Sequence, residues 1–240
     1  MDCKFLLTLI RLLLLGRTGD AAALTVDGSS AESNIGGTAS CSQGALVLDP
    51  ASVQGWANYR ASLAPSAGES GGPVAITARQ IGAFTLSASV GTRFSQSWSG
   101  GSDTNGERGQ TATGMAAGEG FRFSFIPGAI GNFTLMIHVA DFNVDADYAV
   151  TRGGIAVGSG AIAEFGAANT YDEGPVYFHF SVADAAEAAA TWDFDITRSA
   201  TGGGNALLIG GVSLGTAAAV ENPSTIVTPS IFLVNHNVSH

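Results

Sequence analysis

The sequence predicts an all-β fold: an antiparallel β-sandwich (jelly roll) with an N-terminal arm and a C-terminal apolar tail. Short runs rich in Phe, Val, Ile and Thr recur about every ten residues between clusters of Gly, Asn, Asp and Ser, the spacing of strands in a sandwich or jelly roll. Several runs alternate apolar and polar residues with period 2, which is typical of antiparallel sheets that share a core. Hydrophobic residues make up 45% of the 240 residues and charged residues only 12%, so the chain can bury a core.

The first 23 residues are typical of a secretory signal. Lys4 precedes an apolar run from Phe5 to Leu15, and small residues stand at Ala21–Ala23, a site typical of signal-peptidase cleavage. The run is too short to span a bilayer, and Arg11 interrupts it. We therefore expect a secreted protein, extracellular or at the cell surface, without a membrane span.

The expected mature chain is acidic. Removing residues 1–23 takes away three of the 10 basic side chains and two of the 20 acidic ones, which leaves 7 and 18, a net charge of −11, and no lysine. Nucleic-acid binding needs clustered Lys and Arg, so we expect no nucleic-acid partner. Cys3 leaves with the signal and Cys41 stands alone, so the mature chain has no internal disulfide.

The arm, residues 24–45, precedes one expected domain, residues 46–215, which no linker or internal repeat divides. The runs that predict strands are, in order, 44–49, 75–89, 121–126, 133–142, 148–153, 176–183, 190–199 and 206–214. Helix signals are weak, and the Ala-rich run 182–192 is the best helix candidate.

Three of the runs alternate most clearly, and each predicts one core-facing row of side chains. The side chains between them, from Arg122 and Ser124 to Asp193 and Asp195, are expected to face outward. The residues expected to face the core are Phe121, Phe123, Phe125, Phe178, Phe180, Val182, Trp192, Phe194 and Ile196.

Five stretches resemble a jelly-roll module common in exported bacterial proteins. They are WANYR (56–60), FSQSWSGG (94–101), GEGFRFSFIPGAIGNFTLMIHVADFN (118–143), YFHFSVADAAEAAATWDFDIT (177–197) and GGGNALLIGGVSL (202–214). Together they are similar to the galactose-binding-domain-like β-sandwiches. The resemblance implies packing roles for Trp56 and Tyr59, and a polar turn in place of a helix at 182–191. It also implies a carbohydrate-binding, adhesive or structural role, since few such modules are enzymes.

The sequence contains no catalytic motif. It has no G-x-S-x-G, H-E-x-x-H or C-x-x-C pattern, and of its four histidines His138 and His179 lie within strand-like runs, while His236 and His240 lie in the tail. Two outward-facing aspartates on one strand, such as those of the run 190–199, are typical of a solvated surface. We therefore expect that the protein is not an enzyme.

A candidate calcium site lies in the run DFNVDADY (141–148). Asp141, Asn143, Asp145 and Asp147 recur at every second residue, and Ca²⁺ prefers such oxygen ligands. The run departs from the EF-hand loop, because Ala146 stands where glycine is required and no Glu follows at the twelfth position. The resemblance adds that galactose-binding-like folds often hold a structural calcium. The alternative is a hairpin loop whose acidic residues face water.

A candidate glycan site rests on Tyr171 and Asp172, which we expect in a polar loop, NTYDEG, where Tyr171 is the one aromatic residue that we expect to be exposed. Trp98 lies on a strand-like run and is expected in the core. Two sequons, at Asn132 and Asn237, would carry glycans in a host that attaches them.

Residues 216–240 are expected to form a linker and a strand-like tail. The tail is apolar where domain ends are usually polar. Three hypotheses remain open: it pairs with its own sheet or is disordered, it adds a strand to a neighbouring copy, or it binds a membrane or another protein. Its apolar residues, the expected assembly contacts, are Ile226, Val227, Ile231, Phe232, Leu233 and Val234.

The sequence thus favours a secreted, non-enzymatic structural protein that self-associates by strand addition into a filament or surface assembly. The alternative is a secreted carbohydrate-binding, lectin-like module with a structural calcium. An exposed aromatic platform would favour the binding module, whereas open sheet edges and terminal arms would favour assembly.

Overall fold

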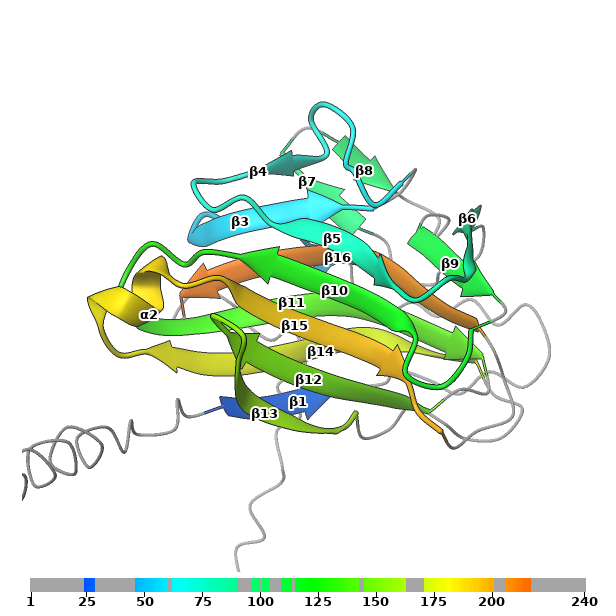
Figure 1. Ribbon diagram of the computed structural model, residues 1–240. Coiled ribbons are helices and arrows are strands. Elements are labelled where there is room, and N and C mark those ends of the chain that lie inside the picture. The colour runs from blue at the N-terminus through cyan, green and yellow to red at the C-terminus, as the bar shows by residue number, and fades with distance from the viewer. Residues whose placement is uncertain are drawn as a thin grey trace, which may run out of the picture.

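A computed structural model describes residues 24–28, 46–59, 62–89, 96–99, 101–103, 109–113, 115–142, 145–162, 171–200 and 206–216. Most of these residues lie in strands, which confirms the prediction of an all-β protein (Figure 1). The strands are β1 (Leu24–Gly28), β2 (Leu46–Val47), β3 (Val53–Asn58), β4 (Ser70–Gly71), β5 (Thr77–Ile81), β6 (Thr85–Ser89), β7 (Gln96–Trp98), β8 (Gly101–Asp103), β9 (Gly109–Thr113), β10 (Gly120–Phe125), β11 (Gly131–Phe142), β12 (Ala146–Arg152), β13 (Ile155–Ala161), β14 (Tyr171–Val182), β15 (Trp192–Arg198) and β16 (Ala206–Thr216), and the helix is α2 (Ala185–Ala189).

The described strands form three sheets. The large sheet has the order β1-β14-β11-β16-β3-β4, with β9 also paired to β16 and β6 paired to β9. The five-stranded sheet has the order β13-β12-β15-β10-β5 and lies in front of the large sheet in Figure 1. The small sheet has the order β2-β7-β8; its β2–β7 pair is parallel, and the other described pairs are antiparallel.

The alternating runs occupy the positions that their period predicts. In β10, β14 and β15 the apolar residues are almost fully buried, and the polar residues between them are half-buried. The aromatic rings from the two main sheets meet, because Phe178 of β14 lies 5.3 Å from Phe194 of β15, and Phe180 lies 4.7 Å from Trp192, measured between ring centroids. The facing sheets therefore share one hydrophobic core.

A second, smaller apolar cluster lies where the small sheet meets the large one. It contains Leu48, Trp56, Met136 and Tyr177, and the half-buried Trp98 packs against it with its ring 6.3 Å from that of Trp56. The predicted packing role of Trp56 is confirmed. Tyr59 is fully buried in the main core, so its predicted packing role is also confirmed.

The polar turn expected at 182–191 is wrong, because α2 occupies its centre. Asp184 caps the helix by accepting a hydrogen bond from the backbone N–H of Glu187 (2.9 Å), while the Glu187 carboxylate accepts one from the N–H of Ala183 (2.7 Å). This reciprocal arrangement resembles a capping box and stabilises the first turn. Glu187 also forms an ion pair with Arg152, and its carbonyl accepts a hydrogen bond from the Trp192 indole, which ties the helix to the core.

The run 75–89, expected as one strand, is divided between two sheets. β5 belongs to the five-stranded sheet and β6 to the large sheet, and the chain turns between them at Gly82, whose φ of 102° favours glycine. Glu119 holds this turn: its carboxylate accepts hydrogen bonds from the N–H groups of Ala83 (3.0 Å) and Ala116 (2.7 Å). These hydrogen bonds lower the pKa of Glu119 below its ordinary value.

Replacing Glu119 with Gln is expected to destabilise the protein at neutral pH, because the amide loses the charge and one of its two acceptor oxygens. Since the folded-state pKa is lowered, the wild-type contribution is fully present above the ordinary glutamate range and disappears as the pH falls through the lowered value. The urea midpoints of the two proteins should therefore differ at pH 7 and converge in acid. An equal difference at both pH values would contradict this role of the carboxylate.

No helix in the part of the chain that the structure describes is long and apolar enough to cross a membrane.

Candidate functional site

The best-defined candidate site is the sheet edge that the N-terminal arm covers. β1 pairs antiparallel with β14 in five successive pairs, from Leu24 opposite Phe180 to Gly28 opposite Val176. β14 would otherwise present a row of backbone N–H and C=O groups along this edge, and such a row is a template for another strand. The pairing of arm and domain is visible in Figure 1, where β1 runs along β14 with β13 of the other sheet beside it.

The side chains of β1 follow the alternation of the edge that it covers. Leu24 and Val26 are half-buried against the main core, while Thr25 between them is exposed. Leu24 also reaches the other sheet, because its Cδ2 atom lies 2.7 Å from the position that a Cβ atom on Gly158 of β13 would occupy. The arm strand therefore closes the gap between the two sheets along this edge.

The docking of β1 combines an entropic cost with favourable contacts of similar size. Fixing the backbone of its five residues costs on the order of 5–10 kcal/mol. Ladder hydrogen bonds at about 1 kcal/mol each, with about 1–2 kcal/mol for each of the two half-buried apolar side chains, return a similar amount.

The expected calcium ligands are spread over two sheets. Asp141 lies near the end of β11 in the large sheet, whereas Asp147 lies in β12 of the five-stranded sheet, opposite Thr197. Asp145 precedes β12 and accepts a hydrogen bond through its backbone oxygen from the N–H of Ser199 (2.7 Å). Asn143 lies outside the described residues. The described residues contain no group of three or more His, Cys, Asp or Glu side chains that could hold a metal.

The expected glycan residues lie in a strand, not in a loop. β14 begins at Tyr171, five residues before the expected start of the run 176–183, because β11 extends to Phe142 and gives it a ladder partner. The register places Asp172 opposite Asp141 and Tyr171 opposite Phe142. The backbone thus brings the first expected calcium ligand beside the expected glycan pair.

Asp193 and Asp195 lie on the outer face of the five-stranded sheet, as the alternation predicts, but they are half-buried and bound to Arg122. The guanidinium donates two hydrogen bonds of 2.6 Å to the carboxylate of Asp195 and lies 3.6 Å from that of Asp193, which also accepts a hydrogen bond from Ser124. The hydrogen bond to Asp195 raises the pKa of Arg122 above its ordinary value. Both carboxylates are held by one cation, so they do not form an acid and base pair for hydrolysis.

The two histidines in the described strands have neighbours that fix them in the fold. Nδ1 of the buried His138 lies 2.6 Å from Nε2 of Gln96, and Nδ1 of His179 lies 2.9 Å from the hydroxyl oxygen of Thr134.

One of the two sequons lies in the described part of the chain. Asn132 is exposed in β11, where its side-chain oxygen accepts a hydrogen bond from the hydroxyl group of Ser181 (2.7 Å). Asn237 lies outside the described residues, as do the signal segment 1–23, Cys41 and the apolar tail residues expected to mediate assembly.

The sequence does not indicate which residues form the edge of β14 that β1 covers. The sequence predicts an arm at 24–45, but neither its register with β14 nor its contact with Gly158. Alternation in the segment LTVDG is the available signal, because Leu24 and Val26 lie two residues apart. Nothing in the sequence indicates that Gly158, in the glycine-rich segment of β13, is the residue that Leu24 contacts.

Comparisons with known proteins assign no family. No protein-family model matches the chain, and no curated protein matches it. Among solved structures, the chain is similar to the enzymatically active domain of bacteriophage CBA120 tailspike protein 4, with 12% sequence identity and a TM-score of 0.37. The match covers 60% of this chain and 19% of that one.

Proposed function

We propose that the mature protein is a secreted, non-enzymatic structural protein whose copies join by exchanging the N-terminal strand β1. The observation that carries the proposal is the pairing of β1 with the edge of β14 in a continuous five-residue register. A neighbouring copy presents the same edge and the same strand, so an exchanged arm makes the same contacts as the arm in its own chain.

The position of the arm favours exchange. Seventeen residues, 29–45, lie between β1 and β2, so a long stretch of sequence joins the strand to the strands that follow. Cleavage after Ala23, which the signal segment predicts, would make Leu24 the first residue of the chain. A free end needs no loop to thread when it enters a neighbouring sheet.

Exchange of arms gives either closed dimers or open chains. If each copy gives its arm to one neighbour and receives one from another, the contacts are head to tail and grow into a filament. The unit that such a filament would repeat is the domain itself. Its antiparallel sheets face each other across one core, which supports the assignment of a jelly-roll sandwich that resembles the galactose-binding-like modules.

The experiment that tests this function is light scattering with negative-stain microscopy on the chain 24–240, intact and ending at Pro223. We expect ordered multimers that grow with concentration in both proteins, because both retain β1. A monomeric intact chain at every concentration would contradict the proposal. Multimers that disappear on truncation would move the contact from β1 to the tail residues 226–234.

A second candidate function is glycan binding, favoured by the register that places Asp172 opposite Asp141. In this proposal a calcium ion bound near the two aspartates steadies the strand ends, and Tyr171 provides the ring on which a sugar stacks. Calcium should then raise the melting temperature of the intact protein, and Asp141→Asn should abolish the increase. The absence of any shift with millimolar calcium would exclude the metal.

A further inference from the structure

We propose that Gly158 determines which strand this edge accepts: the space left by its missing side chain receives Leu24 of a second copy. The inference rests on the proposed exchange of β1, and it names the residue that gives the exchange its specificity. The partner is therefore a second copy of this chain, through residues 24–28.

The side chain of Leu24 occupies the space over Gly158. A Cβ atom at this position would lie 2.7 Å from Cδ2 and 3.9 Å from Cγ of Leu24, so the end of the Leu24 side chain would have to move to make room for it. The backbone of Gly158 does not adopt a positive φ, unlike that of Gly153 or Gly154 in the preceding turn. The glycine here thus provides space for Leu24 and does not serve a special backbone conformation.

The neighbouring positions of β13 do not contact Leu24 in the way that Gly158 does. Gly160 lies on the same face, but the space over it is filled by Tyr148 of the adjacent strand, whose ring lies 3.1 Å from the point that a Cβ atom would occupy. Ser159 between the two glycines is exposed on the other face, opposite Ala149. Of the two glycines, Gly158 is therefore the one whose space the arm fills.

The contact selects for residue size at position 24. Leu24 lies opposite Phe180 in the register and bridges to Gly158 in the other sheet, so a larger residue at 158 and a smaller residue at 24 compensate each other. Either change alone leaves a clash or a cavity at the edge.

The complementary sizes of residues 24 and 158 provide a test in which only exchange between copies restores assembly. In the mature full-length chain, Gly158→Val and Leu24→Ala are each expected to raise the concentration needed for assembly about tenfold or more. In a mixture of the two variants, the enlarged edge of the Gly158→Val chain can receive the shortened arm of the Leu24→Ala chain. The unchanged edge of the Leu24→Ala chain can in turn receive the unchanged arm of the Gly158→Val chain. We expect the mixture to assemble where each variant alone is monomeric, with energy transfer between donor and acceptor dyes placed at the C-termini of the two variants.

Ser159→Val is the matched control, because it places a valine on the same strand but on the face away from the arm; it should assemble like the wild type. A mixture that assembles no better than its components, or a Gly158→Val chain that assembles like the wild type, would overturn this inference while the proposed function stands. A wild-type chain that is monomeric throughout would overturn both.

Discussion

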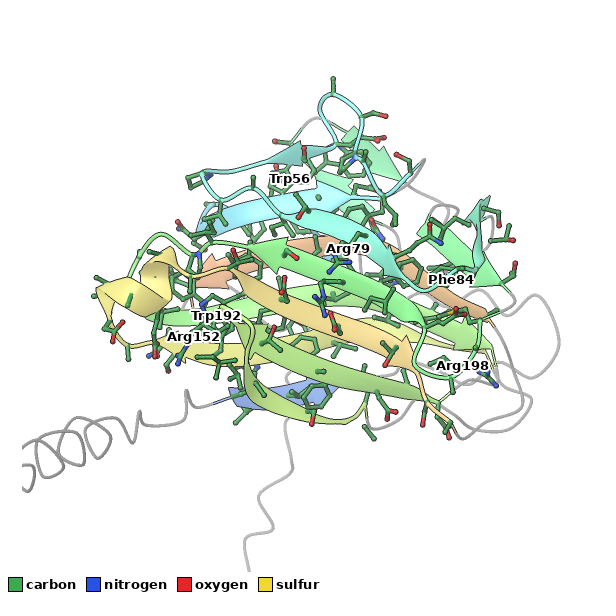
Figure 2. The ribbon with its side chains drawn as sticks, viewed as in Figure 1. Trp56, Arg79, Phe84, Arg152, Trp192 and Arg198 are labelled. Carbon is green, nitrogen blue, oxygen red and sulfur yellow. The ribbon has the colours of Figure 1, made fainter. Side chains whose placement is uncertain are left out.

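Replacing Trp192 with Ala is expected to lower the free energy of unfolding by about 3–5 kcal/mol. Trp192 is fully buried at the start of β15, and its ring lies 4.7 Å from that of Phe180 in the facing sheet. Its indole N–H donates a hydrogen bond to the carbonyl of Glu187 (3.2 Å), and Arg152 lies 5.6 Å from the ring centre. The substitution therefore removes a core side chain and one tie of α2 to the sheet (Figure 2).

Trp98→Ala is the matched control for this prediction. Trp98 is half-buried and packs against the smaller cluster beside the small sheet, so the same change of side chain should cost much less. Urea unfolding followed by circular dichroism measures both variants. Equal losses at the two positions would contradict the assignment of the main core to the space between the two larger sheets.

Val26→Asp is expected to raise the concentration needed for assembly about a hundredfold or more, because an unpaired carboxylate is costly in an apolar setting. Val26 lies opposite Phe178, packs against the main core, and has no described cation beside it in the register of β1. The charged arm would leave the edge in its own chain and would find no better site in a neighbour.

Thr25→Asp adds the same charge one residue away, on the exposed face of β1, and should assemble nearly as the wild type does. Sedimentation velocity over a range of concentrations compares the three proteins. Loss of assembly in both variants would indicate that net charge, and not the buried face of the arm, controls association. Assembly of the Val26→Asp chain like that of the wild type would exclude β1 as the contact.

The sequence predicts the central strands well and the edges poorly, for a physical reason. In β10, β14 and β15 one face is buried, so apolar and polar residues alternate along the sequence. The structure confirms the strands that this alternation predicts. β13 is glycine-rich and mostly exposed, so no alternation marks it, and the sequence does not predict it. The start of β14 at Tyr171 escapes prediction because its pairing with β11, and not its composition, extends the strand.

Two local signals in the sequence indicate a helix and a change of sheet that the predicted strands and turns leave out. Asp184 followed by Glu187 matches a helix start, yet the resemblance favours a turn at 182–191, and α2 forms there. Gly82 marks the point at which the run 75–89 changes sheets. The contact at Gly158 has no such signal, because its partner Leu24 is distant in the sequence and meets it only when both sheets are in place.

The most direct test of arm exchange is a disulfide between two chains at the register of β1. Thr25 lies opposite His179, and directly opposed residues of antiparallel strands are close enough for a disulfide. One chain would carry Thr25→Cys and the other His179→Cys, both with Cys41→Ser, and a single chain with both cysteines would control for pairing within the chain. We expect a disulfide-linked heterodimer when the two chains are mixed and oxidised. A disulfide that forms only within the doubly substituted chain, and never between the two chains, would contradict arm exchange.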